Sequence, residues 1–296
     1  MIEQKVAESR TKRGRVMKIN GAADVLAVFI ATGFGAGLIP LAPGTFGSLV
    51  GLGIAYGLIV NLRFETVALQ NALLLALSGE VPTHDAQAIR INGTAIGNLD
   101  AKARRLKGLA SVPEERNGHA AVPDLSLADN TLLTARQRIG LVANGFIRSG
   151  RSRDYANKII QRFGVKANGV SAPARSLSGG NLQKFIMGRE ILQTPTALVV
   201  SQPTWGVDAG AAAAIHQALV DLAAQDAAII VISQDLDELL TLCDRLAVIN
   251  EGKLSAPLDV AGVSIEKIGL LMGGVHGEAP HGAAAAQTLE AQHVPA

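Results

Sequence analysis

The stretch "ARSLSGGNLQKFIMGRE", residues 174–190, decides how the rest of the chain is interpreted. Ser178 and the glycines at 179 and 180 stand directly before a run with helical character. N–H groups at the start of a helix point out of it and attract anions, and glycine lets the main chain come close to a phosphate. An ordinary N-cap is the plainer alternative, because serine commonly precedes a helix. The neighbouring segments decide between the two interpretations.

The sequence downstream of this helix alternates between strands and helices. "TALVV", residues 196–200, and "AIIVI", residues 228–232, are uninterrupted apolar runs typical of buried parallel strands. Residues 210–225, between them, place apolar side chains at helical spacing. "DLDELLTLC" predicts a short helix, and "RLAVINEGKL" predicts two strands around a turn. This order predicts a doubly wound α/β layer.

"LSGGN" and the later "QPTWGVDAGA" resemble the signature and D-loop of ATP-binding-cassette (ABC) ATPases, whose usual signature is LSGGQ. The resemblance covers about residues 70–277 and includes "NALLLALSGE", "IRINGTAIG" and "GLASVPEERNGHAAVPDLSLADN". These segments are similar to the second nucleotide-binding half of tandem ATPases that drive uptake of simple sugars or nucleosides. The resemblance implies ATP and Mg²⁺ as ligands. It also implies membrane permease subunits and a second nucleotide-binding domain as partners, at the cytoplasmic face of the inner membrane.

The chain departs from this family where ATP would be held. No GxxxxGK[ST] run occurs, and "VNLRFETVAL" stands where that P-loop belongs. Without the amides, lysine and hydroxyl of a P-loop, tight binding of ATP in cis is not expected. The family's catalytic positions are also altered; they are occupied by Glu114 (Q-loop), Ser201 and Gln202 (after the strand at 196–200) and Gln234 (switch histidine). A glutamine can hydrogen-bond water but cannot take its proton.

The signature itself is retained. In the family, the signature of one half closes on ATP held by the P-loop of the other half. The resemblance assigns Ser178, Gly179, Gly180 and Gln183 to that face, and Asp208 to the D-loop. We therefore expect the chain to contribute at most a signature face in trans to a complete ATPase subunit, and to provide no metal ligands of its own.

Residues 25–60 contain no charged side chain and follow a basic segment. A membrane-spanning helix needs about 20 apolar residues. Pro40 and Pro43 divide the run, which favours a membrane-embedded helical hairpin, or one helix with a re-entrant piece. The basic flank would then lie on the cytoplasmic side. The alternative is a pair of helices buried in a soluble core.

Within this run, "ATGFGAGLIPLAPGTFGSLVG", residues 31–51, resembles the opening motif of the phosphatidylglycerophosphatase A family, which dephosphorylates a membrane lipid precursor. The magnesium-handling carboxylates of that family have no counterpart later in this chain, although a hard cation needs several oxygen ligands. A dinucleotide-binding GxGxxG site is disfavoured because Leu38 stands at the position of its third glycine.

Two family fragments therefore meet near residues 61–70. Three functions stay open: an ABC-type subunit of a sugar or nucleoside importer that cannot hydrolyse ATP alone, a membrane lipid phosphatase fragment, and an inactive gene-fusion product. The fold predicted is α/β, an ABC-type nucleotide-binding domain that lacks its P-loop and follows a short apolar, membrane-associated helical segment. The predicted divisions are a basic segment 1–20, an apolar fragment 21–64, an ABC ATPase-like domain 65–277 and a disordered tail 278–296.

Composition narrows the partners further. A net charge of +2 and an aromatic content of 3% argue against a nucleic-acid partner. Cys243 is the only cysteine, which excludes an internal disulfide and a cysteine metal cluster. Arg104, Arg105 and Lys107 are interpreted as a solvated helix face.

Overall fold

The computed structural model describes residues 25–30, as backbone, and residues 71–274. These two ranges contain a seven-stranded sheet in the order β10-β9-β1-β8-β7-β4, with β11 also paired to β9. Neighbours from β9 to β4 run parallel, whereas β10 and β11 run antiparallel to β9. The strands are β1 Val25–Ile30, β4 Leu109–Val112, β7 Ala197–Ser201, β8 Ala228–Ser233, β9 Arg245–Asn250, β10 Lys253–Leu254 and β11 Leu258–Asp259.

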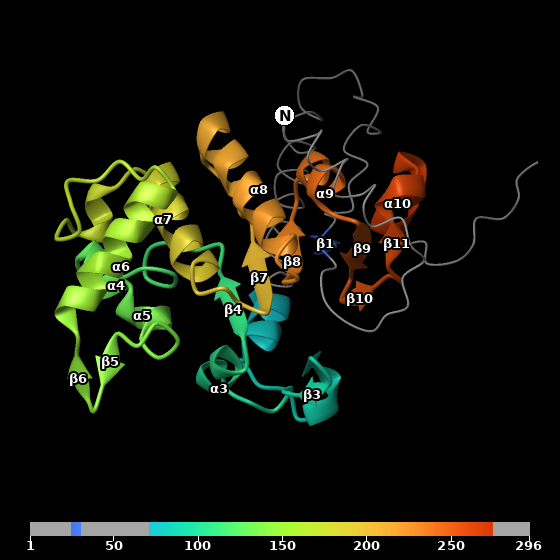
Figure 1. Cartoon of the computed structure of the whole chain (residues 1–296). Coiled ribbons are helices and arrows are strands. Elements are labelled where there is room, and N and C mark those ends of the chain that lie inside the picture. The colour runs from blue at the N-terminus through green and yellow to red at the C-terminus, as the bar shows by residue number, and fades with distance from the viewer. Residues whose placement is uncertain (1–24, 31–70, 275–296) are drawn as a thin grey trace, which may run out of the picture.

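Helices connect these strands. A lobe beside the sheet contains α4, α5, α6 and the start of α7 (Figure 1). The helices are α3 Ala101–Leu106, α4 Leu127–Asn130, α5 Leu132–Ala135, α6 Ser149–Arg162, α7 Gly179–Ile191, α8 Ala209–Ala223, α9 Leu236–Leu242 and α10 Ile265–Met272. Residues 71–78 are also helical. Two small hairpins pair β2 Arg90–Ile91 with β3 Thr94–Ala95, and β5 Val142–Ala143 with β6 Phe146–Ile147.

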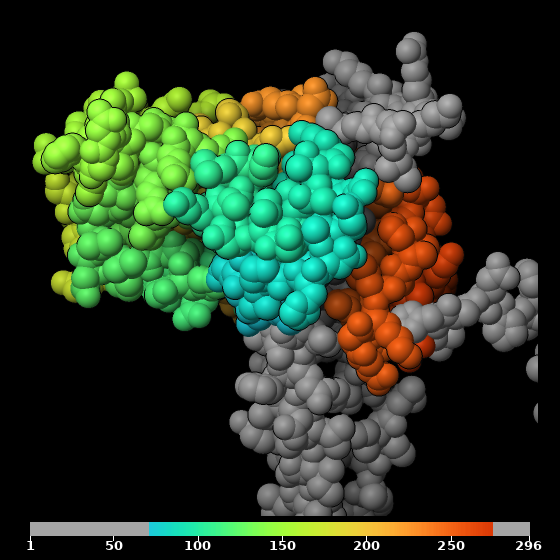
Figure 2. Space-filling view, turned by 90° about the horizontal axis from the view of Figure 1, so that it is seen from below, coloured from blue at the N-terminus to red at the C-terminus, as the bar shows by residue number. Residues whose placement is uncertain are grey.

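Both faces of the sheet are covered. Leu198 and Val200 of β7 belong to the larger apolar cluster, whereas Val199 between them belongs to a smaller cluster with Leu74. The helical segment 71–78 therefore covers the face opposite to the larger core, and Figure 2 shows this blue-green part of the chain on the underside. Burial on both faces is the reason why these parallel strands are continuous apolar runs.

The elements predicted downstream of the signature are confirmed. The runs at 196–200 and 228–232 are β7 and β8, and the helix expected at 210–225 is α8. The short helix in "DLDELLTLC" is α9. The turn between β9 and β10 has positive φ at Glu251 (48°) and Gly252 (75°), as a two-residue hairpin turn of the primed type requires.

The prediction of a helical membrane segment is wrong for residues 25–30, which form β1 in the middle of the sheet. Val28 lies opposite Ile232 of β8 and Ala247 of β9. A short apolar run such as "VLAVFI" has no periodicity that separates a buried strand from a helix. Here the run forms a strand because it hydrogen-bonds in parallel to both β8 and β9. No helix in the described ranges is long and apolar enough to cross a membrane.

The rest of the apolar run, the junction at 61–70 and the tail 278–296 lie outside the described residues. The domain divisions at residues 20, 64 and 277 stay predictions. The pairing of β1 nevertheless places residues 25–30 in the same sheet as β7, β8 and β9.

Arg104 does not belong to a solvated face. Its side chain is fully buried, and its guanidinium donates hydrogen bonds to four carbonyl oxygens, those of Ala76, Leu77, Gly97 and Leu99. A guanidinium has five N–H donors, so it can tie the end of helix 71–78 to the segment before α3 without an opposing carboxylate. The prediction of a solvated face was based on charge alone and is wrong for this residue.

Candidate functional site

The first turn of α7 is open. Ser178 is its N-cap residue, with extended backbone angles, but the side chain makes none of the usual capping bonds. The first intrahelical hydrogen bond runs from the Leu182 N–H to the Ser178 carbonyl oxygen, at 2.9 Å. The N–H groups of Gly179, Gly180 and Asn181 precede this bond and point out of the helix end. Ser178 therefore does not act as an ordinary side-chain cap.

Asn181 orients the Ser178 hydroxyl. Asn181 Nδ2 donates to Ser178 Oγ at 2.9 Å, and Asn181 Oδ1 accepts from the Lys166 N–H at 2.9 Å. Because Ser178 Oγ accepts from Asn181, the hydroxyl hydrogen is free to donate to an anion at the helix end. Asn181 was missed among the predicted site residues. Its place as the fifth residue of the signature was the signal that could have found it.

Gln183 lies behind this face rather than on it. Its side chain is 1% exposed, and both ends of its amide are engaged. Oε1 accepts from Arg116 Nε at 3.1 Å, and Nε2 donates to the Pro203 carbonyl oxygen at 3.0 Å. Gln183 therefore holds the helix against the D-loop segment. The sequence had suggested that it contacts a partner's ATP, but its buried side chain does not reach the open turn.

Arg116 connects the signature to the D-loop. Besides its bond to Gln183, it donates from Nη2 to the carbonyl oxygen of Trp205. Its Nη1 lies 2.9 Å from the position that a Cβ would take on Gly179. Burial lowers the pKa of Arg116, and the charge of Glu114 opposes that shift. The guanidinium therefore lies against the glycine turn, where its positive charge adds to that of the helix end.

Asp208 is brought to the same place. It caps α8 by accepting from the Ala211 N–H at 2.9 Å. This hydrogen bond lowers the pKa of Asp208, with a smaller contribution from the charge of Lys184. Asp208 Oδ2 lies 3.6 Å from the Cβ position at Gly180. The structure thus places the predicted D-loop residue beside the predicted signature glycines.

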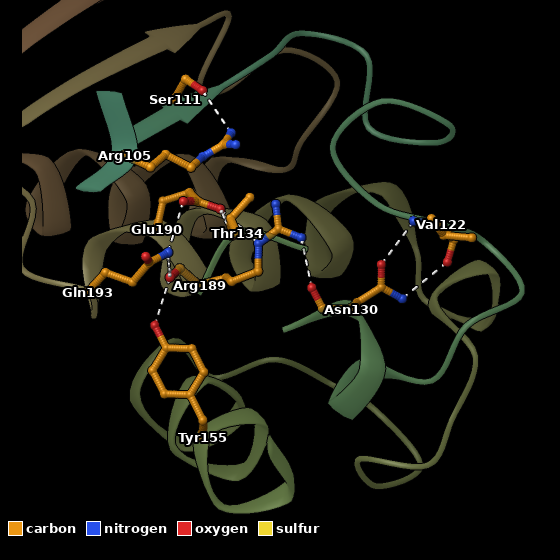
Figure 3. Close-up of polar contacts among 9 residues, drawn as sticks. All are labelled: Arg105, Ser111, Val122, Asn130, Thr134, Tyr155, Arg189, Glu190 and Gln193. Atoms are coloured by element: carbon orange, nitrogen blue, oxygen red, sulfur yellow. Dashed lines mark hydrogen bonds and ion pairs between the residues drawn. The ribbon is translucent and has the colours of Figure 1, made fainter. Parts of the chain in front are cut away.

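A buried polar network fixes α7 in the lobe (Figure 3). Arg189 and Glu190 form an ion pair of 2.8 Å between Nε and Oε1, and both side chains are almost fully buried. Arg189 Nη1 donates to the Asn130 carbonyl oxygen at 3.1 Å, and Thr134 donates to Glu190 Oε1 at 2.6 Å. Tyr155 donates to the Arg189 carbonyl oxygen at 2.7 Å, and burial, followed by the charge of Glu190, raises the pKa of its hydroxyl. A satisfied buried network of this kind holds a helix in one position.

The ends of β7 and β8 are different. Ser201 is fully buried, and its Oγ has no hydrogen-bond partner within the described part of the chain. Gln202 is 5% exposed, has a positive φ of 50° and donates its N–H to the Ile232 carbonyl oxygen at 2.7 Å. Gln234, after β8, is half-buried. These positions carry neutral side chains.

Ser201 and Gln202 stand at the positions where the resemblance implies magnesium-handling carboxylates. Between residues 71 and 274, no group of three histidine, cysteine, aspartate or glutamate side chains is arranged to hold a metal ion. Mg²⁺ is bound in proteins through carboxylates together with phosphates and water. Ser201 and Gln202, at the positions where the resemblance implies carboxylates, do not fit that requirement.

Glu114 faces a cavity of about 510 Å³ beside the D-loop. Its Oε2 is buried without a hydrogen-bond partner among the described residues. Burial raises the pKa of the Glu114 carboxyl, and the charge of Arg116 opposes the shift. The residues that line the cavity are Asn71, Leu74, Leu75, Glu114, Glu115, His119 and Trp205.

The sheet, the helical lobe and the adjoining signature and D-loop define the fold of an ATP-binding cassette. The dimeric, post-hydrolysis structure of the cassette MJ0796 bound to ADP and Pi is similar with a TM-score of 0.58 and 15% identity, over 84% of this chain and 89% of that one. A nucleotide-free cassette from an ABC transporter gives a TM-score of 0.54 and 18% identity, over 81% of each chain. No protein-family model matches the chain.

Among individual proteins, the chain is similar to import ATP-binding proteins for nucleosides and sugars. It is 34% identical over 205 residues to the guanosine import ATP-binding protein NupO of Bacillus subtilis, which covers 69% of this chain and 40% of NupO. It is 36% identical over 197 residues to the xylose import ATP-binding protein XylG of Burkholderia ambifaria, which covers 66% of this chain and 37% of XylG. The chain thus spans about 40% of the length of NupO.

These findings confirm the resemblance to sugar and nucleoside import ATPases at the level of homology and fold. They do not show the resemblance of residues 31–51 to phosphatidylglycerophosphatase A, and those residues lie outside the described ranges. The lipid-phosphatase and gene-fusion alternatives stay predictions.

Proposed function

We propose that this chain is a cassette subunit of a sugar or nucleoside importer, and that it supplies a signature face to ATP held by another cassette. One observation carries the proposal. The first turn of α7 offers three outward N–H groups and an oriented Ser178 hydroxyl, whereas Ser201, Gln202 and Gln234, at the positions of the family's catalytic residues, carry no charge. The turn of α7 is therefore equipped to contact a phosphate, and the side chains at 201, 202 and 234 are not suited to hold Mg²⁺.

At this face the chain's own residues bind and orient. The N–H groups of Gly179 and Gly180 and the Ser178 hydroxyl donate to phosphate oxygens, and the positive end of the α7 dipole favours their negative charge. Arg116 adds a positive charge beside the glycines. ATP supplies the phosphoryl group, and Mg²⁺ bound with it is held by residues of the subunit that carries the P-loop.

The partners follow from the relatives. NupO and XylG are named as import ATP-binding proteins for guanosine and xylose, respectively. We propose the same general role here, with permease subunits in the membrane and a second cassette as partners at the cytoplasmic face. A cassette subunit does not touch the solute, so the face described here is independent of solute identity.

The experiment is a comparison of two arginine substitutions. Ser178→Arg places a long side chain on the open turn of α7, whereas Ser171→Arg places it on an exposed position before the signature loop. ATP turnover of a cassette with a complete P-loop is measured with each variant as its partner. The proposal predicts loss of the stimulated turnover with Ser178→Arg alone. Equal turnover with both variants would contradict it.

A further inference from the structure

Glu238 accepts three hydrogen bonds in the interior of the chain. It lies in the first turn of α9 and is 5% exposed. Its Oε1 accepts from Thr204 Oγ1 at 2.7 Å and lies 2.8 Å from His216 Nε2, and its Oε2 accepts from Ser233 Oγ at 2.8 Å. A buried carboxylate is costly unless such donors satisfy it, and hydrogen bonds to a charged acceptor are the stronger ones.

The donors come from three separate segments. Thr204 belongs to the D-loop segment that ends at Asp208, and His216 lies on α8, the helix that Asp208 caps. Ser233 ends β8 and directly precedes Gln234, the position of the family's switch histidine. One carboxylate therefore joins the D-loop, the helix after it and the switch segment.

This junction is connected to the signature. Asp208 lies 3.6 Å from the Cβ position at Gly180, and Arg116 bonds both Gln183 and the Trp205 carbonyl oxygen. A shift of the D-loop would therefore change the surroundings of the glycine turn. The backbone bond from the Gln202 N–H to the Ile232 carbonyl oxygen ties the start of the D-loop segment to β8, and Glu238 adds a side-chain link from Thr204 to Ser233.

We infer that Glu238 is a positioning residue that sets the D-loop relative to the switch segment, so that a displacement at one segment reaches the other. The inference rests on the proposed function, because its consequence for turnover requires a partner's ATP at the signature. The coupling itself is a property of this chain alone and can be measured without the partner.

The test is amide hydrogen exchange of the full chain carrying Thr204→Val, with Thr241→Val as the matched control. Thr204→Val removes the D-loop donor at nearly constant shape. Thr241 makes its hydroxyl bond to the Asp237 carbonyl oxygen, within α9. Loss of a hydrogen bond to a charged group should speed exchange of the amides at 205–208 by about tenfold. Exchange at 234 and 235, on the other side of Glu238, should rise as well, whereas exchange at 228–232 of β8 and in the later part of α9 should stay unchanged.

Ser233→Ala provides the second arm, because Ser233 makes no hydrogen bond to the D-loop itself. Faster exchange at 205–208 in this variant as well would support transmission through Glu238. Unchanged exchange at 205–208 in Thr204→Val, or an equal increase across β8 and α9, would overturn the inference. The same variants are then assayed for partner turnover, where a fall in kcat at constant KM for ATP tests the proposed function separately.

Discussion

The start of α7 and the ends of β7 and β8 contrast within one cassette. At the start of α7, the donors are exposed, oriented by Asn181 and supported by Arg116. At the strand ends, Ser201 and Gln202 are neutral and buried, and no metal-binding cluster occurs among the residues from 71 to 274. The first region keeps the chemistry of an anion-binding helix end, whereas the second keeps the backbone of a catalytic strand end without its charges.

The two sides of an ATP site differ in what they require of a chain. The signature side needs only backbone N–H groups and one hydroxyl, which follow from a helix start and a glycine pair. The strand-end side needs carboxylates whose burial must be offset by Mg²⁺ and phosphate. Under the proposed function, the chain supplies the half that the fold provides by itself.

The largest expected effect comes from placing a charge at the strand end. Ser201→Asp introduces the carboxylate that the resemblance implies, at a buried position where Ser201 Oγ has no hydrogen-bond partner among the described residues. An unpaired buried charge should lower the free energy of unfolding by about 3 kcal/mol. Chemical denaturation measures this. Ser201→Ala is the control and should be neutral, since it removes an unsatisfied hydroxyl; a stable Ser201→Asp chain would show that the strand end still accepts charge.

The second effect concerns the open turn. Gly179→Val places a side chain over the first N–H groups, and its Cβ would meet the end of the flexible Arg116 side chain at 2.9 Å. Arg116 would have to swing away and give up hydrogen bonds to Gln183 and Trp205, so stability should fall by about 1 kcal/mol. Stimulated turnover of the partner should fall by about 100-fold, which corresponds to about 2.7 kcal/mol of transition-state stabilisation. Turnover is assayed, with far-ultraviolet circular dichroism as the folding control. Normal turnover would show that the first turn of α7 does not contact the partner's ATP.

The third change uses a glycine in the body of the same helix. A Cβ on Gly188 would meet Phe163 Cδ2 at 2.7 Å and Ile159 Cγ2 at 2.8 Å, within the packed contact with α6. Gly188→Ala should lower stability by about 2 kcal/mol through overpacking. Thermal unfolding measures this loss. Below the unfolding transition the variant should still stimulate the partner's ATP turnover. Loss of stimulation in a folded sample would contradict the statement that only the first turn of α7 acts on the partner.

The smallest effect is a pH dependence at Glu114. Burial raises the pKa of this carboxyl above its ordinary value of 4.5, so the folded chain keeps the proton to higher pH than the unfolded chain. The contribution of Glu114 to stability is fully present below pH 4.5 and is lost as the pH rises through the folded pKa. Glu114→Gln should therefore gain stability relative to the wild type between pH 4.5 and 7. Equal pH profiles of denaturation would show that Glu114 is solvated.

The helices and strands from the signature onward were predicted because their apolar residues recur at regular spacing and because strands and helices alternate along the chain there. β7, β8, α8 and α9 follow from apolar runs and helical spacing. β1 was misassigned to a helical membrane segment, since a short apolar run next to prolines and glycines has the same composition in both settings. Its place between β8 and β9 is set by pairing with strands about 200 residues downstream, which local patterns do not contain.

The candidate site was predicted in part. Ser178, Gly179, Gly180 and Asp208 lie together as the motif order suggests. Gln183 follows Gly179 by one helical turn on the same side of α7, and at that depth the side is covered by the D-loop segment, so its amide bonds Pro203 and is buried. Asn181 could have been found from its place in the signature, whereas Arg116 and Glu238 act through contacts that exist only in the folded chain and gave little signal in the sequence.

The most direct test of the central claim is a count of bound nucleotides. A one-to-one complex of this chain with a cassette that has a complete P-loop is prepared with Mg-ATP under conditions without turnover, and the tightly bound ATP per complex is measured. One ATP per complex is expected, held by the partner's P-loop against the signature of this chain, and it should be lost with Ser178→Arg. Two ATP molecules per complex would contradict the account, because the second would require a complete site in this chain.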